Sequence, residues 1–109
     1  MDKQFFNAAT AYTLSDSVDY APQSIVSRII KQNDRGGLTL FAFDAGQGLS
    51  EHTAPFDAIV QVVEGTATIL IDGKPHEVAA GQFIIMPANV PHAVEAKQPF
   101  KMLLSMIKA

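Results

Sequence analysis

The fold is decided by the stretch GQGLSEHTAPFDAIVQVVEG at residues 46–65 and by a shorter counterpart, GQFIIMPANVPHA, at residues 81–93. Each begins at a glycine, contains a run of apolar and β-branched residues, and carries one histidine, His52 or His92. β-Branched residues favour half-buried strands, and glycine and proline mark the turns that bound them. The two stretches therefore predict short strands joined by tight loops, with one histidine beside a loop in each.

The same pattern of short strands extends over most of the chain. Further runs rich in β-branched or aromatic residues lie at 24–30, 38–43, 66–71 and 100–107. Asp72-Gly73 predicts a hairpin between two such runs, because both positions of the tight turn favour positive φ. Nine or ten short strands, counted along the chain and separated by Gly, Pro, Asn and Asp turns, predict an all-β sandwich or barrel.

The chain has 109 residues, the length of one domain. Residues 1–22 lack the strand pattern and are expected to form an N-terminal arm, with a short helix from Gln4 to Tyr12, ahead of a β domain at 23–109. Several strands are apolar on both faces, so the outer face needs cover. We expect a second copy of the chain to supply it in a homodimer, with cover by the arm as the alternative.

Composition narrows the class of function. Hydrophobic residues make up 48% and charged residues 17%, as in a globular protein. A net charge of −3 without a basic run argues against nucleic-acid partners and against docking on an anionic membrane. The chain has no cysteine, which excludes disulfides and thiolate metal sites. No secretory signal or bilayer-length apolar segment is recognisable, so a cytoplasmic location is expected.

The two opening stretches resemble the two motifs of the cupin superfamily, in its small single-domain form (the cupin 2 or RmlC-like type). The glycines, the proline and the histidine stand where the motifs have them, at Gly46, Gly65, Gly81, Pro87 and His92. The resemblance covers residues 38 to 107 and implies a double-stranded β-helix, that is, a jelly-roll barrel. Cupins include dioxygenases, sugar isomerases, decarboxylases, storage proteins and ligand-sensing domains, so the fold alone does not assign an activity.

The resemblance also implies a metal site of three histidines and one glutamate. His52 and His92 stand at two of these ligand positions, whereas Ala54 replaces the remaining histidine and Ala58 replaces the glutamate. Catalytic zinc sites and oxygen-activating iron sites use three protein ligands, so two imidazoles form an incomplete set. A divalent transition metal (Zn, Mn, Fe, Ni or Cu) on His52 and His92 is the candidate cofactor. Asp57 is expected to face away, unless a β-bulge near Pro55 turns it inward.

The alternation of side chains along a strand predicts a pocket around the two histidines. Its predicted lining is His52, Ala54, Ala58, Val60, Met86 and His92. Phe41 or Phe43, Phe83 or Ile85, Met102 and Met106 are further candidates from facing strands. The alternative is that the Met and Phe side chains simply fill the barrel.

Three functions stay open at this point. The first is a non-catalytic cupin that binds a small, partly apolar ligand in its barrel, which the two missing metal ligands favour. The second is a metal-dependent enzyme, a dioxygenase or isomerase, that uses His52 and His92 with water or substrate as further ligands. The third is a metal-free enzyme in which one of these histidines acts as an acid or base.

Overall fold

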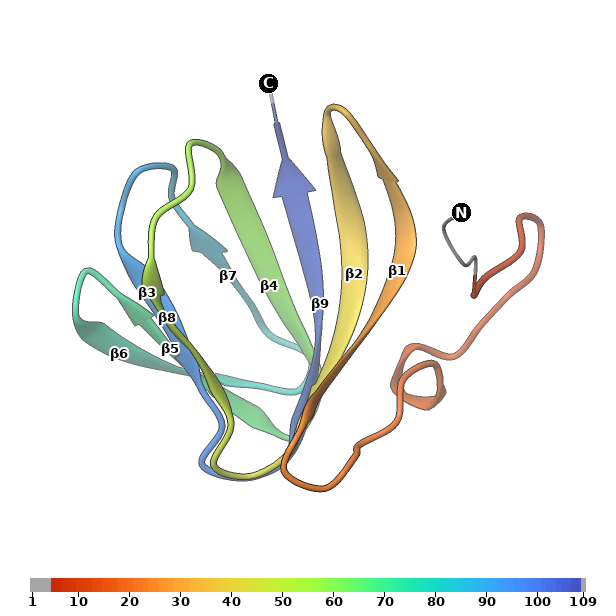
Figure 1. Cartoon of the computed structure of the whole chain (residues 1–109), viewed down its shortest axis with the longest axis horizontal. Coiled ribbons are helices and arrows are strands. Elements are labelled where there is room, and N and C mark those ends of the chain that lie inside the picture. Colours follow the sequence, from red (N-terminus) through yellow and green to blue (C-terminus); the bar gives the residue numbers. More distant parts are fainter. Residues whose placement is uncertain (1–4, 109) are drawn as a thin grey trace.

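The computed structural model describes residues 5–108, and within them the fold is almost entirely β (Figure 1). The strands are β1 (Ile25–Asn33), β2 (Gly36–Phe43), β3 (Gly48–His52), β4 (Asp57–Glu64), β5 (Thr66–Ile71), β6 (Lys74–Ala79), β7 (Phe83–Met86), β8 (His92–Glu95) and β9 (Phe100–Ile107). They form one sheet in the order β1-β2-β9-β4-β7 and a second in the order β3-β8-β5-β6. All pairings are antiparallel, which confirms the predicted jelly roll.

The predicted hairpin at Asp72-Gly73 joins β5 to β6. Ile71 pairs with Lys74 across the turn, and the two turn residues have φ of 53° and 78°. Positive φ at both positions is the geometry that matches the right-handed twist of the flanking strands. This local signal is therefore strong enough to set the register of the hairpin.

The prediction of a short helix from Gln4 to Tyr12 is wrong. Gln4 lies outside the described residues, and the rest of this segment is not helical. Ala9 has a left-handed φ of 58°, which a right-handed helix does not allow. The Tyr12 hydroxyl accepts a hydrogen bond from the Asn7 amide at 3.0 Å and closes a loop instead. Helical structure in the described arm is a single 3-10 turn, η1 (Leu14–Asp16). No helix within residues 5–108 has the length and apolar character needed to cross a membrane.

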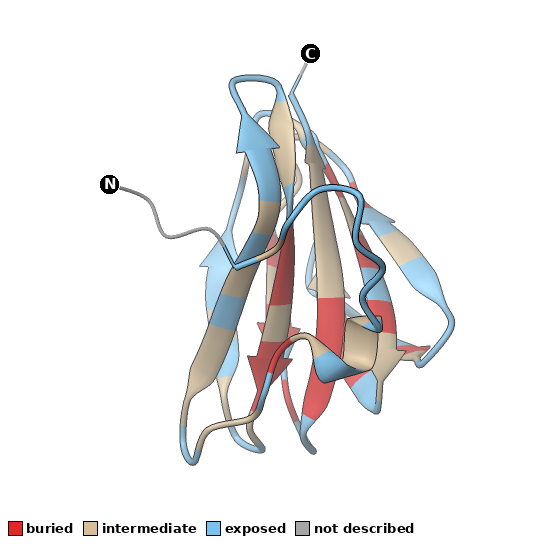
Figure 2. Ribbon diagram, turned by 90° about the vertical axis from the view of Figure 1, so that its right-hand side faces the viewer, coloured by how far each residue is buried: buried red, intermediate tan, exposed pale blue. Residues whose placement is uncertain are grey.

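The arm covers part of the outer face of the five-stranded sheet. Val18 is buried against Leu40 and Ala42 of β2, and Phe6, Leu14, Tyr20, Val26, Ile30 and Leu103 pack around them. Lys101 of β9, which is buried, donates a hydrogen bond from Nζ to the Ser15 carbonyl at 2.5 Å. Figure 2, which faces this side of the molecule, shows the arm lying across the strands.

The opposite edge of the same outer face stays exposed. Phe83 and Ile85 of β7 are 67% and 51% exposed, so the expectation that one of them lines the pocket is wrong. Their neighbours Ile84 and Met86 point inward and pack in or against the core between the sheets. The exposed pair gives the predicted homodimer a candidate contact face, and the dimer itself stays a prediction.

The two sheets enclose one main core, and it has two unlike ends. At the end where β9 begins, Phe43 and Phe100 are fully buried and stack with centroids 4.6 Å apart and planes at 9°. At the other end, the top of Figure 1, the sheets diverge. Figure 2 shows the buried segments mostly in the lower half of the molecule. We call these the closed end and the open end of the barrel.

Candidate functional site

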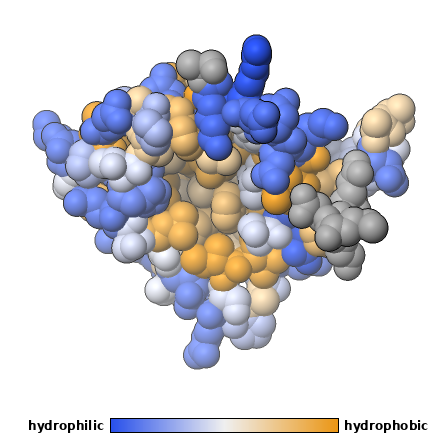
Figure 3. Space-filling view, turned by 45° about the horizontal axis from the view of Figure 1, so that its top comes forward, coloured by the Kyte–Doolittle hydropathy of each residue, from blue (hydrophilic) through white to orange (hydrophobic). Residues whose placement is uncertain are grey.

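A pocket of about 200 Å³ lies between the two sheets near the open end. Its lining residues are Leu49, His52, Ala54, Phe56, Ala58, Met86, His92, Val94, Met102, Leu104 and Met106. Figure 3 brings the open end forward and shows apolar side chains around a hollow, ringed by hydrophilic ones. A 150 Å³ apolar cavity in a protein is known to hold benzene, so this pocket has room for a molecule of about that size.

The structure places most of the predicted pocket residues in this lining. His52, Ala54, Ala58, Met86 and His92 are among the lining residues, as are Met102 and Met106. Val60 faces inward but is fully buried in the packed core below the pocket, outside the lining. Leu49, Phe56, Val94 and Leu104 also line the pocket and were missed by sequence reasoning. For Leu49 the reason is a bulge, which sequence alternation does not reveal.

The bulge lies in β3 and brings His52 to the pocket. Leu49 pairs with Val94, and His52 pairs with His92. Between these two pairs β3 advances by three residues, whereas β8 advances by two. One extra residue on a strand switches the face of all residues after it. Leu49 and His52 therefore both face inward, although they would face opposite sides of a regular strand.

Asp57 lies outside the pocket, and the idea that a bulge near Pro55 turns it inward is wrong. Asp57 is exposed at the start of β4, and its Oδ1 accepts a hydrogen bond from the Ala88 amide at 2.8 Å. The carboxylate thus ties the loop after β7 to the start of β4. Its role in the described structure is to hold the loop that leads to His92.

The loop before β8 is held on both sides, which fixes where His92 points. Asn89 adopts a left-handed φ of 64°, as asparagine tolerates, and its amide donates to the Ala54 carbonyl at 2.7 Å. The Pro91 carbonyl accepts from the Asp72 amide at 2.8 Å. The two segments that carry the pocket histidines are therefore joined to each other through Ala54 and Asn89.

His52 and His92 meet at the pocket with their Nε2 atoms 3.2 Å apart. The ring centroids are 4.4 Å apart and the planes cross at 70°. The Nδ1 of His52 lies 2.8 Å from the Ser50 carbonyl oxygen, and the Nδ1 of His92 lies 3.2 Å from that of Val90. A carbonyl oxygen only accepts, so these partners assign the proton to Nδ1 in both rings. In this tautomer each Nε2 is an acceptor, and the two Nε2 atoms lie side by side at the pocket.

Burial keeps His92 neutral. Its side chain is 4% exposed, and this burial is the main cause that lowers the pKa of His92 below its ordinary value. The hydrogen bond to Val90 raises the pKa and the neighbouring His52 lowers it further. Near pH 7 the Nε2 of neutral His92 is therefore a hydrogen-bond acceptor.

The donor set does not fit the metal site that the cupin resemblance implies. Methyl groups stand at two of the four ligand positions, Ala54 and Ala58. Within residues 5–108, no three side chains of the His, Cys, Asp or Glu types gather where they could hold a metal ion. A divalent ion bound here would have two imidazoles and no anionic partner in an apolar pocket, which is costly. We therefore derive no reaction step through such an ion.

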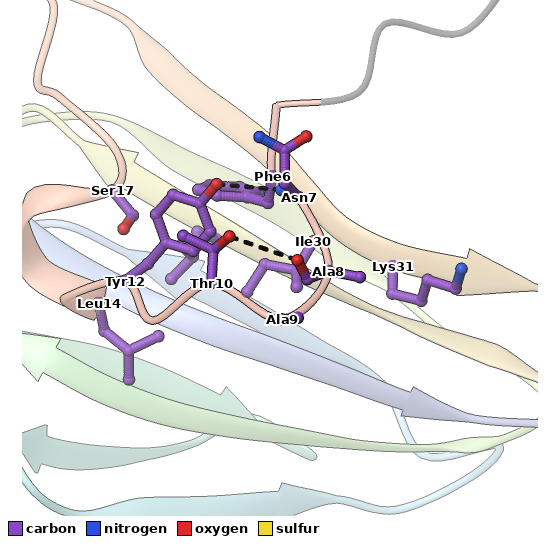
Figure 4. A pocket seen from close by; sticks show the side chains of 11 residues that line it. Phe6, Asn7, Ala8, Ala9, Thr10, Tyr12, Leu14, Ser17, Ile30 and Lys31 are labelled. Atoms are coloured by element: carbon purple, nitrogen blue, oxygen red, sulfur yellow. Dashed lines mark hydrogen bonds between the residues drawn. The ribbon is translucent and has the colours of Figure 1, made fainter.

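A larger hollow of about 420 Å³ lies between the arm and β1 (Figure 4). It is lined by arm residues together with Ile30, Lys31 and Leu40. Several of its polar groups pair with backbone groups of the arm: the Tyr12 hydroxyl accepts from the Asn7 backbone amide, and the Thr10 hydroxyl donates to the Ala8 carbonyl at 3.3 Å. Among the described lining residues the charged side chain is Lys31. This hollow offers no converging set of free polar groups, so we place the functional site at the histidine pair.

Comparison with known proteins agrees with the fold. The family model of the cupin domain matches residues 39–106, well over half of the chain. The chain belongs to the cupin family. This cupin is similar to a conserved protein of unknown function from Streptococcus pyogenes, with 37% identity, a TM-score of 0.92, and 97% of this chain and 93% of that one covered.

Two further solved structures show how far the likeness extends. A cupin 2 conserved barrel domain protein from Leptotrichia buccalis is 39% identical with a TM-score of 0.86; the match covers 89% of this cupin and 47% of that chain. KdgF from Halomonas sp. is 20% identical with a TM-score of 0.70, over 97% and 92% of the two chains, and shows the fold alone. Among curated proteins, no sequence matches.

Proposed function

We propose that this cupin binds a small, mostly apolar molecule bearing one hydroxyl or N–H donor in the pocket at the open end. The observation that carries the proposal is the convergence of the Nε2 atoms of His52 and His92, 3.2 Å apart, in an otherwise apolar pocket. With the proton on Nδ1, each Nε2 is an acceptor. A ligand hydroxyl or N–H beside the pair can then donate a hydrogen bond to either one.

The shape and chemistry of the lining support the same class of ligand. Leu, Val, Phe, Ala and Met side chains make up the lining apart from the histidines. Such a lining binds an apolar body through burial, and the few polar groups set its orientation. The volume of about 200 Å³ suits one six-membered ring with a small substituent rather than a nucleotide or a sugar phosphate.

Phenol and toluene test this proposal as a matched pair, because they have the same size and differ in the hydroxyl donor. The readout is the NMR signal of the ¹³C-labelled methyl groups of Met86, Met102 and Met106, all of which line the pocket. We expect saturable shifts with both molecules and roughly tenfold tighter binding of phenol, the effect of one net hydrogen bond. Equal affinities would refute the role of the histidine pair, and no saturable shift would refute the pocket.

Substitutions at two alanines test where phenol binds. Ala54→Leu places a larger side chain in the lining and should abolish the phenol shifts. Ala45→Leu makes the same change on an exposed turn and should leave them unchanged. Phenol binding that survives in Ala54→Leu would place the molecule elsewhere.

A further inference from the structure

Within the described chain the two sheets end in edge strands, and one of these edges differs from the rest. The edges are β1 and β7 in one sheet and β3 and β6 in the other. Proteins protect edge strands from pairing with other chains by charged side chains, proline and bulges. The other three edges carry such features: Arg28, Lys31 and a bulge in β1, Glu51 and a bulge in β3, and Lys74, Pro75 and Glu77 in β6.

The unprotected edge is β7. Its four residues, Phe83–Met86, include no charged residue and no proline. It pairs with β4 from Phe83 to Met86 without a shift in register, so it has no bulge either. By these criteria β7 is open to pairing with a strand of another chain.

The main chain of β7 directs hydrogen-bonding groups to its free side. The Val62 amide of β4 donates to the Gln82 carbonyl at 3.0 Å, so this carbonyl points towards β4. Successive residues of a strand direct their main-chain groups to opposite sides. The amides and carbonyls of Phe83 and Ile85 therefore point away from β4, which is the one neighbour of β7 in its sheet.

The side chains of the same two residues are also free of cover, since Phe83 is 67% and Ile85 51% exposed. A groove of about 460 Å³, lined by residues of β6 and β7, runs beside this edge. Figure 1 shows β7 beside β4 at the edge of its sheet. A strand from another chain can therefore reach both the main chain and the side chains of this edge.

Charge favours a second copy of the chain as the occupant. The net charge of −3 makes two copies repel each other on average. Residues 79–91, however, include no charged residue. Glu77, which lines the groove, accepts a hydrogen bond from the Thr68 hydroxyl at 2.8 Å and pairs with Lys97 at 3.5 Å. Two β7 edges can therefore meet without bringing uncompensated like charges together.

One register uses all the free main-chain groups of two such edges. In an antiparallel pair with its two-fold axis at Ile84, Phe83 of each copy lies opposite Ile85 of the other. Both residues then exchange N–H···O bonds with their partners. A shift by two residues would place one of them opposite Gly81, whose amide already donates to β4 at 2.8 Å, or opposite Pro87, which has no amide.

We propose that β7 pairs antiparallel with β7 of a second copy and joins the two five-stranded sheets into one. Phe83 and Ile85 then contact each other across the strands on the outer face. The contact involves one short strand of each copy, so we expect a weak dimer with a Kd on the order of 10 μM. Neither residue lines the barrel pocket, so this inference does not rest on the proposed ligand.

Sedimentation velocity of the whole chain, from about 1 μM to about 1 mM, tests the pairing. We expect a change from monomer to dimer over this range. The amides of Phe83 and Ile85 should exchange hydrogen more slowly as the dimer fraction rises, whereas those of β6 should not change. A dimer that leaves these two amides unprotected would overturn the proposal. A chain that stays monomeric would overturn it too, and would leave an extended segment of another protein as the occupant of the edge.

Ile85→Pro tests the role of the main chain. It removes an amide on the free side of the strand, where proline is tolerated, and leaves the pairing with β4 in place. We expect the Kd of the dimer to rise at least about tenfold. Leu38→Glu is the control, because it places a charge at an exposed position of β2 on the same outer face. It should dimerise as the unmodified chain does. An unchanged Kd in Ile85→Pro, or an equal loss in Leu38→Glu, would contradict pairing through the edge.

Phe83→Glu and Ile85→Lys test the register, and they do so even if Ile85→Pro does not fold. Each variant alone should dimerise at least about tenfold more weakly, because a charge replaces an apolar contact at the interface. A mixture of the two should recover a heterodimer, because the new carboxylate lies opposite the new ammonium group. A mixture of Phe83→Glu with Phe83→Lys is the matched control and should recover less. No recovery in the first mixture, or equal recovery in both, would overturn the register centred on Ile84.

Discussion

The closed and open ends of the barrel are built from the same two sheets but are filled differently. At the closed end, Phe43 and Phe100 stack across neighbouring segments and leave no room between them. At the open end, Ala54 and Ala58 lie near the histidine pair, and a pocket of about 200 Å³ remains. Side-chain size, rather than the path of the backbone, thus decides which end of this barrel can receive a ligand.

Truncating a large side chain at each end should give the largest difference in stability loss between the two ends. Phe100→Ala should lower the free energy of unfolding by about 3–5 kcal/mol, because a fully buried ring is replaced by a cavity. Met106→Ala, half-buried beside existing empty space, should cost less than about 2 kcal/mol. Urea unfolding of both variants measures the difference. Equal losses would show that the open end is packed as tightly as the closed one.

Enlarging a small side chain at each end should give the next largest difference in stability between the two ends. Ala67 is fully buried at the closed end, so Ala67→Leu should destabilise the protein by about 1–3 kcal/mol through overpacking. Ala54→Leu extends into the open pocket and should change stability by less than about 0.5 kcal/mol. The same unfolding experiment compares them, and a large loss for Ala54→Leu would contradict the open pocket.

Lowering the pH should give the smallest change in the free energy of unfolding, and this change should arise at the open end. Because burial lowers the pKa of His92 in the folded chain, the unfolded chain binds more protons below its ordinary value of 6.5. Stability is therefore full above about pH 6.5 and declines as the pH falls toward the folded-state pKa. His92→Gln should flatten the decline between pH 7.5 and 5.5, whereas His76→Gln, at an exposed position, should not. An unchanged slope in His92→Gln would assign the acid sensitivity to other groups.

Strand positions and the Asp72-Gly73 turn could be predicted because they depend on local preferences. The meeting of His52 and His92 followed from the motif resemblance, and the inward direction of Ala58 and Val60 followed from alternation. Phe83 and Ile85 were misassigned because their strand is apolar throughout and alternation gives no direction there.

Other features depend on contacts between segments distant in sequence. The bulge between Leu49 and His52 is defined only by the register against β8. The anchoring of the arm also depends on a long-range contact. The Tyr20 hydroxyl donates a hydrogen bond at 2.5 Å to the carboxylate of Glu64, which lies forty-four positions further along the chain. Neither residue type nor spacing indicates that these groups meet. The contacts of the two Nδ1 atoms with the Ser50 and Val90 carbonyls likewise depend on how the backbone places these carbonyls.

Xenon binding tests most directly whether the empty space is confined to the open end. Xenon enters apolar cavities of this size without needing any particular chemical group. We predict that xenon shifts the methyl NMR signals of Leu104 and Met106 at the open end and leaves those of Val62 and Ala67 at the closed end unchanged. Shifts of similar size at both ends, or none at the open end, would contradict the account.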